Sequence, residues 1–173
     1  MYKKIINFCL ILIFFSSCIN NKVDENDIDN FISKYEFEDF SFFKDYRIII
    51  RQKNFSETIY MISDSETNID SVLYFVYVDN FSNKISQIKV GNDKNSIIFQ
   101  ALTDIKIKEI INKYKIYNFP YLSVNNDNSV SINPFFVDMN PYLLRLKTKS
   151  DEENIKKNYS VFKHYKKNWY IKD

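Results

Sequence analysis

Five short runs rich in β-branched and aromatic residues follow one another between residues 47 and 102, and they limit the possible folds more than any other feature. They are RIIIRQ, ETIYMIS, VLYFVYV, KISQIKV and SIIFQAL, at residues 47–52, 57–63, 72–78, 84–90 and 96–102. Such side chains pack well on the pleated surface of a strand. The connections DNFSN and GNDKN contain Asn and Asp, which tolerate positive φ in tight turns. Short connections join antiparallel strands, so we expect a series of hairpins.

Two segments carry the apolar spacing of an amphipathic helix. The longer segment covers residues 103–115, where Thr103 or Asp104 can cap the start. The shorter one covers residues 27–35, with Asp27 as the expected cap. The apolar faces consist of Ile107, Ile110, Ile111 and Tyr114 in the longer segment and of Ile28, Phe31, Ile32 and Tyr35 in the shorter one.

The rest of the chain again predicts strands. Residues 122–124 and 130–132 form a hairpin around 125–129, PYLLRLKT gives a further strand, and YSVFKHY with NWYIK gives a closing hairpin. The fold class is therefore α+β: a mostly antiparallel twisted sheet, covered by the helix at 103–115, with the short helix at 27–35 nearby. A curled, barrel-like sheet is the alternative.

The first 18 residues, MYKKIINFCLILIFFSSC, have the layout of an export signal. Two lysines precede a mostly apolar run at residues 5–15, which is shorter than the roughly 20 residues that a membrane-spanning helix needs. The run ends in Phe15, Ser16, Ser17 and Cys18. This ending resembles the lipobox of bacterial lipoproteins, although Phe15 occupies a position that is usually leucine. The alternative is an ordinary or uncleaved signal segment with an incidental cysteine.

The resemblance implies that residues 1–17 are a signal peptide and that Cys18 carries lipid, which would tether the protein to a membrane of the bacterial cell envelope. Two or three acyl chains hold a protein stably, whereas one binds reversibly. Residues 18–26 would then be an acidic tether and residues 27–173 a single domain. Four acidic residues either keep this tether solvated or resemble the signals that send some lipoproteins to the outer cell surface; they are Asp24, Glu25, Asp27 and Asp29. We expect the protein to be anchored in the outer membrane. The sequence leaves open whether it faces the periplasm or the cell exterior.

Removal of residues 1–17 changes the charge and the cysteine content. The net charge falls from +2 to zero because Lys3 and Lys4 are lost, so no overall charge attracts nucleic acid. Cys9 is lost as well, and with Cys18 acylated neither a disulfide nor a thiolate metal site can form. Stability must then come from packing, for which 30 aromatic residues supply apolar area: 13 Tyr, 16 Phe and one Trp.

Several kinds of catalytic and cofactor site are not expected. Gly91 is the only glycine, which argues against P-loop, Rossmann and EF-hand sites. His164 is the only histidine, so a histidine cluster for zinc or copper cannot form, and we predict no metal, no cofactor and no catalytic residues. Acidic residues are concentrated locally at Asp127 and at residues 151–153. A carboxylate pair for glycoside hydrolysis or a calcium site is the alternative there, but we favour an Asn-rich turn and a solvated charge run.

The segment KHYKKNWYIK interleaves cations with aromatic residues. His164, Trp169 and Tyr170 form a candidate contact surface if the aromatic residues are exposed, because Trp and Tyr are common in interface hot spots. The main hypothesis is a noncatalytic envelope lipoprotein that binds another macromolecule, a protein of the envelope or a secreted one, for example as an immunity or inhibitor protein. The alternatives are an envelope glycan hydrolase with paired carboxylates and a structural or assembly lipoprotein.

Overall fold

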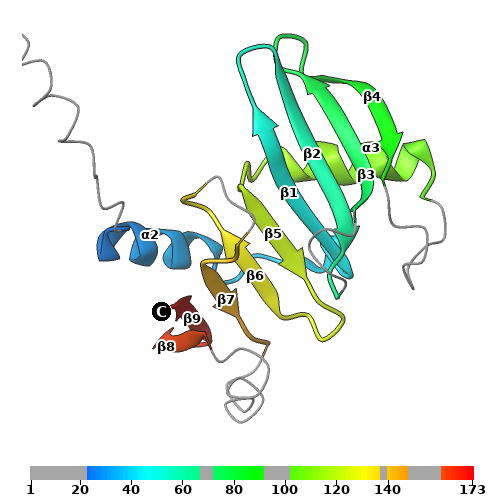
Figure 1. Ribbon diagram of the computed structural model, residues 1–173. Helices are drawn as coiled ribbons and strands as arrows, with labels where there is room; N and C mark the ends of the chain where they lie inside the picture. The colour runs from blue at the N-terminus through cyan, green and yellow to red at the C-terminus, as the bar shows by residue number, and fades with distance from the viewer. Residues whose placement is uncertain (1–22, 67–71, 92–101, 137–139, 148–160) are drawn as a thin grey trace, which may run out of the picture. The chain divides into compact units, whose positions relative to one another are not determined.

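The computed structural model describes residues 23–66, 72–91, 102–136, 140–147 and 161–173 (Figure 1). The chain divides into two compact units, Met1–Glu36 and Phe37–Asp173. The second unit therefore begins ten residues after the domain start expected at residue 27. No helix among the described residues is long and apolar enough to cross a membrane.

The described part of the first unit contains helix α2, Glu25–Tyr35. Its N-cap is Asp24, whose side chain accepts a hydrogen bond from the Asn26 backbone N–H at 2.8 Å. The helix thus begins two residues before the predicted start, and Asp27 lies in its first turn rather than at the cap. Both positions suit a carboxylate, because an acidic side chain is favourable throughout the first turn of a helix.

The second unit is dominated by one sheet, and nine strands of it lie in the described residues. The strands are β1 (Tyr46–Lys53), β2 (Glu57–Asp64), β3 (Val72–Asp79), β4 (Lys84–Val90), β5 (Tyr121–Val124), β6 (Val130–Asn133), β7 (Leu143–Arg145), β8 (Phe162–Lys166) and β9 (Trp169–Lys172). Every pair of neighbouring strands is antiparallel. The predicted hairpins are confirmed, except that most of the expected strand at 96–102 lies outside the described residues.

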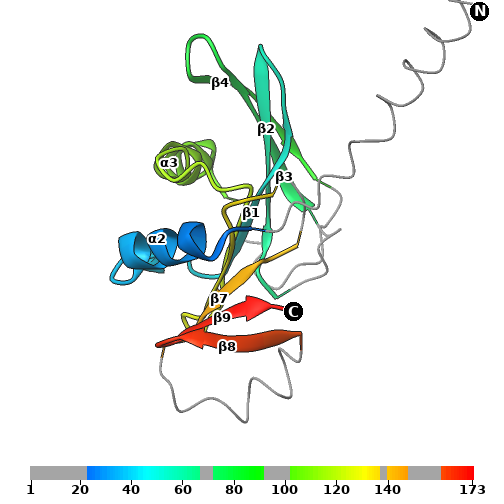
Figure 2. The same ribbon diagram turned by 90° about the vertical axis from the view of Figure 1, so that its left-hand side faces the viewer.

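The strand order is β4-β3-β2-β1-β5-β6-β7-β9-β8. The first four strands form a meander, and the chain then returns from β4 at one end of this order to place β5 beside β1. Helix α3, Asp104–Tyr114, belongs to this return and lies on one side of β1, β2 and β3 (Figures 1 and 2). Since β4 and β8 stand at opposite ends of the order, the described strands form an open sheet rather than a closed one.

Helix α3 forms as the sequence predicts, with Thr103 as its N-cap. The Thr103 hydroxyl accepts a hydrogen bond from the Lys106 backbone N–H at 3.2 Å, and the four predicted apolar residues of α3 are buried. At the end of the helix, the Tyr114 ring contacts the rings of Phe43 and Tyr60 edge to face. These contacts hold the helix against the sheet through aromatic packing.

The core lies on both faces of the central strands. One face carries a row of paired apolar residues across five strands, made up of Ile62, Ile48, Leu122, Ile132 and Leu143. The opposite face carries the cluster of Ile49, Met61 and Tyr121, against which Phe75 packs. Burial on both faces explains why β5 and β6 are buried along their whole length.

Candidate functional site

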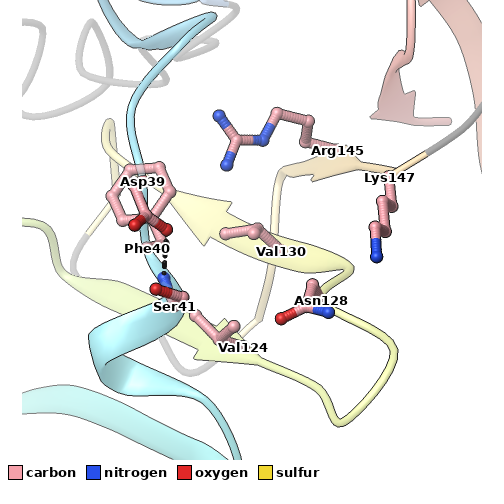
Figure 3. A pocket seen from close by; sticks show the side chains of 8 residues that line it. All are labelled: Asp39, Phe40, Ser41, Val124, Asn128, Val130, Arg145 and Lys147. Carbon is pink, nitrogen blue, oxygen red and sulfur yellow. Dashed lines mark hydrogen bonds between the residues drawn. The ribbon is translucent and has the colours of Figure 1, made fainter.

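A pocket of about 410 Å³ lies in the second unit, beside the β5–β6 hairpin (Figure 3). Three segments contribute to its wall: residues 39–41, the β5–β6 hairpin, and the end of β7 with the residues that follow it. The lining residues are Asp39, Phe40, Ser41, Val124, Asn128, Val130, Arg145 and Lys147. Apolar and charged groups therefore meet in one hollow, which is the usual make-up of a site that binds a polar ligand.

The hairpin turn that forms one wall is fixed by its own hydrogen bonds. The Asn125 N–H donates to the Ser129 carbonyl at 3.0 Å, and the Asn128 N–H donates to the Asn125 carbonyl at 3.0 Å. Asn128 has a φ of 65°, a conformation that asparagine tolerates better than most residues. Asp127 accepts from the Ser129 N–H at 2.7 Å, so this carboxylate stabilises the turn. The turn thereby presents the Asn128 side chain to the pocket.

A short turn places the opposite wall. The Asp39 carboxylate accepts a hydrogen bond from the Ser41 backbone N–H at 2.9 Å, which starts the 3₁₀ helix η1, Ser41–Phe43 (Figure 3). The Phe40 ring is almost fully buried and packs against the rings of Tyr117 and Phe119. The segment is therefore anchored by Phe40, while Asp39 and Ser41 stay exposed at the pocket.

Arg145 is the most constrained polar residue of the pocket. Its guanidinium carbon lies 5.0 Å from the centre of the Phe40 ring and 5.5 Å from that of the Trp169 ring. One of its nitrogens, Nη2, donates to the Glu38 backbone carbonyl at 2.9 Å. Cation–π contacts and this hydrogen bond together fix the planar guanidinium in one orientation. Figure 3 shows this group turned toward Asp39 and Phe40.

The charges around the pocket influence one another. Burial lowers the pKa of Arg145, and the nearby carboxylates of Glu38 and Asp39 oppose that shift. The hydrogen bonds from Ser41 hold the pKa of Asp39 below its ordinary value, with a smaller contribution from the positive charges of Lys113 and Arg145. Lys147 is exposed and adds a second cation to the lining. Two cations and one carboxylate therefore face the pocket, so its lining favours an anionic group.

The chemistry that this lining supports is recognition of a carboxylate or a phosphate. A guanidinium can bind such a group through two parallel hydrogen bonds, and the Lys147 ammonium would add a flexible positive charge. Asn128 and Ser41 supply neutral donors and acceptors. Asp39 is the one carboxylate among the lining residues, whereas glycoside hydrolysis needs a pair.

The contact surface expected at the C-terminal hairpin does not include its two aromatic residues. Trp169 is 0% exposed and Tyr170 is 2% exposed, so neither can form a surface. The reason is that side chains pack against both faces of β9. Trp169 packs with Arg145 on one face, and Tyr170 joins the apolar cluster of Leu144 and Leu146 on the other.

His164 is exposed, but it has local partners. Its Nε2 lies 2.9 Å from the Lys167 carbonyl, and its ring contacts the Tyr170 ring edge to face at 5.3 Å between centroids. His164 thus lies on strand β8, bonded to the β8–β9 turn, and is not among the residues that line the pocket. Cys18 and the acidic residues 151–153 lie outside the described residues.

Arg145 and Lys147 were not among the residues singled out from the sequence. The available signal was the run LLRLK, in which a guanidinium interrupts an apolar strand. A charged residue at such a position has to find partners inside the fold, and this makes it a candidate for a site. Phe40 gave no comparable signal, because phenylalanine occurs at four of the positions between residues 37 and 43.

Comparisons of the chain with protein-family models, with curated protein sequences and with solved structures found no significant match.

Proposed function

We propose that this protein is a noncatalytic lipoprotein of the bacterial cell envelope, anchored through lipid on Cys18, that binds another protein through the pocket around Arg145. The N-terminal sequence supports the anchor, because FSSC follows a short apolar run and two lysines. The pocket supports the binding role. The partner contributes an acidic side chain or a terminal carboxylate.

The observation that carries the binding role is the fixed position of the Arg145 guanidinium. It is held between Phe40 and Trp169, and its Nη2 is bonded to the Glu38 carbonyl. A pre-oriented arginine loses little conformational entropy when it binds a carboxylate, and arginine is over-represented in the hot spots of protein interfaces. The pocket is open to a partner's side chain and has apolar walls at Val124 and Val130.

One form of this function is immunity, in which the bound partner is a toxin that arrives at the envelope. A second form is assembly, in which the partner is a resident envelope protein. Both use the same pocket, and they differ in where the partner is found. A strain without the protein should lose in competition with toxin-producing kin under the first form and not under the second.

The binding role is tested by affinity capture with residues 18–173 as bait. Detergent-solubilised envelope and culture supernatant serve as separate sources, and captured proteins are identified by mass spectrometry. Lys147→Glu should reduce recovery of the partner at least tenfold, because a cation in the lining of the pocket is replaced by an anion. Lys108→Glu is the matched control, since Lys108 is exposed on α3 and does not line the pocket. Equal loss with both variants would contradict a role for the pocket.

The anchor is tested separately, by mass spectrometry of the protein purified from its native membrane. The expected mass is that of residues 18–173 plus a diacylglycerol and an acyl group on Cys18. Cys18→Ser should leave the chain unlipidated and release it from membranes. A native chain that retains residues 1–17 would refute the anchor and leave the binding test unaffected.

A further inference from the structure

Two exposed phenylalanines occupy the adjacent turns at one end of the sheet. Phe55 lies in the β1–β2 turn and is 85% exposed, and Phe81 lies in the β3–β4 turn and is 68% exposed. Their ring centroids are 5.0 Å apart in an edge-to-face arrangement. Tight turns favour Asn, Gly, Asp and Ser, so the turn geometry does not require either aromatic side chain. The pair forms a small apolar tip surrounded by water.

The two turns of the tip are hydrogen-bonded to each other. The Asn80 backbone N–H donates to the Ser56 carbonyl at 2.9 Å, and the Asn80 side chain donates to the Asn54 carbonyl at 2.7 Å. The Thr58 hydroxyl in turn donates to the Asn80 side-chain oxygen at 2.8 Å. These bonds satisfy backbone groups that would otherwise need water. A segment that enters an apolar environment must satisfy its polar backbone groups in this way.

Lysines surround this tip. Lys53 and Lys84 are exposed at the strand ends next to the two turns, and the Lys115 Nζ donates to the Asn83 carbonyl at 2.9 Å. Two carboxylates, Glu57 and Asp79, also lie at these strand ends. The Asp79 carboxylate accepts from both the N–H and the hydroxyl of Ser82, at 2.6 and 2.7 Å, so it is directed into its own turn. The three lysines outnumber the two carboxylates, which leaves the tip with a net positive charge of one.

We propose that the tip formed by Phe55 and Phe81 inserts into the surface of an anionic lipid bilayer. Aromatic side chains are favoured at the membrane interface, and lysines beside them are attracted to anionic headgroups. A third exposed apolar residue, Ile116, follows Lys115 in the chain and is 79% exposed. The proposal rests on the proposed envelope anchor only in that the lipid on Cys18 would keep a bilayer within reach of the tip.

This contact would orient the second unit. Strand β1 starts beside the pocket, where the Asp45 N–H donates to the Val124 carbonyl at 2.8 Å, and it ends at the tip with Lys53. Its eight residues span roughly 26 Å at about 3.3 Å per residue. Figures 1 and 2 show the tip turns and the β5–β6 turn at opposite ends of the sheet. With the tip in the bilayer, the pocket faces away from it, toward an incoming protein.

The test uses residues 18–173, in which Cys18 is the one cysteine left once Cys9 is gone. Cys18 is coupled to a maleimide lipid in vesicles of phosphatidylcholine and phosphatidylglycerol, so every molecule is tethered by the same bond. Phe55→Trp then reports insertion through quenching by brominated acyl chains. Phe37→Trp is the matched control, because Phe37 is 91% exposed and is not in the tip. The native Trp169 is buried and contributes a constant background.

The expected result is quenching of the F55W signal and no quenching of the F37W signal above background. Phe81→Ser in the F55W chain should abolish most of that quenching, and pure phosphatidylcholine or high salt should weaken it. Unquenched F55W, or equal quenching of F55W and F37W, would overturn the proposal. Because the coupling is artificial, this outcome does not depend on whether Cys18 is acylated in the cell, and the two proposals can fail independently.

Discussion

At the scale of single residues, Tyr114 is the side chain through which helix α3 is bonded to the strands beneath it. Its hydroxyl donates to the Phe119 carbonyl at 2.6 Å and lies 3.3 Å from the Ile48 carbonyl. Tyr114→Phe should lower the free energy of unfolding by about 1–2 kcal/mol, because a buried acceptor loses its donor. Urea denaturation followed by Trp169 fluorescence measures the change. Tyr77→Phe serves as control, since that hydroxyl meets an exposed lysine, and it should shift stability by less than about 0.5 kcal/mol.

The same tyrosine predicts how stability changes at alkaline pH. Burial raises the pKa of Tyr114 well above its ordinary value, with smaller contributions from Tyr60 and Tyr121. In the unfolded chain the phenol ionises near pH 10, whereas in the fold it stays neutral. Its contribution is therefore complete below about pH 10 and is lost as the pH rises from there toward the folded pKa. The stability difference between wild type and Y114F should be smaller at about pH 11 than at about pH 8, with the decrease starting near pH 10; equal differences at the two pH values would contradict this assignment.

Residue identity alone predicted the core well and the site poorly. The helix residues Ile107, Ile110 and Ile111 are buried as their spacing predicts. Trp169 and Tyr170 are buried as well, although the lysines beside them in the sequence were compatible with either burial or exposure. Local sequence could not decide this, because alternation along β9 does not reveal that residues of another strand, Arg145 and Leu144, pack against its two faces.

At the scale of elements, the start of α3 depends on a single side-chain bond. Thr103 accepts from the Lys106 N–H, and the Asp104 carboxylate in the first turn suits the positive end of the helix dipole. Thr103→Ala should therefore lower stability by about 1 kcal/mol, whereas Thr103→Ser should restore most of the loss. Thermal unfolding of the three chains provides the measurement. No difference between the alanine and serine variants would show that the cap is dispensable.

Element identity was largely predictable, because turn chemistry and periodicity agree along the chain. Asn83 and Asn128 occupy positive φ in the β3–β4 and β5–β6 turns, where Asn-rich connections were expected. The start of α2 was placed two residues late, because Asp24, Asp27 and Asp29 can each serve as a cap. Spacing of apolar residues fixes the face of a helix more firmly than it fixes its first residue.

At the scale of the whole molecule, strand order was the part that the sequence could not supply. Hairpins predict that consecutive strands pair, but they do not reveal that β5 pairs with β1 or that β9 lies between β7 and β8. These long-range pairings bring residues 39–41, 128 and 145 together into the pocket. A site assembled from segments about 100 residues apart leaves no local motif, which explains why Arg145 was not recognised from the sequence.

The separation of pocket and tip along β1 leads to a prediction about orientation at the membrane. If the tip meets the bilayer, a label beside it must lie closer to the lipid than a label at the pocket, by up to the roughly 26 Å that β1 spans. Residues 18–173 with Cys18→Ser can be held on nickel-chelating vesicles by an N-terminal histidine tag. A donor dye is attached to Ser56→Cys in one chain and to Lys147→Cys in another, both of which are exposed positions.

Energy transfer to an acceptor lipid should be clearly stronger from the S56C label than from the K147C label. Phe55→Ser with Phe81→Ser should abolish the difference, because the apolar contact proposed to hold the tip at the bilayer is then removed. Equal energy transfer from the two labels in chains that keep Phe55 and Phe81 would mean that the pocket is not turned away from the membrane. In the predicted orientation, the pocket lined by Arg145 and Lys147 lies at the end of the sheet away from the bilayer, where the proposed partner would reach it.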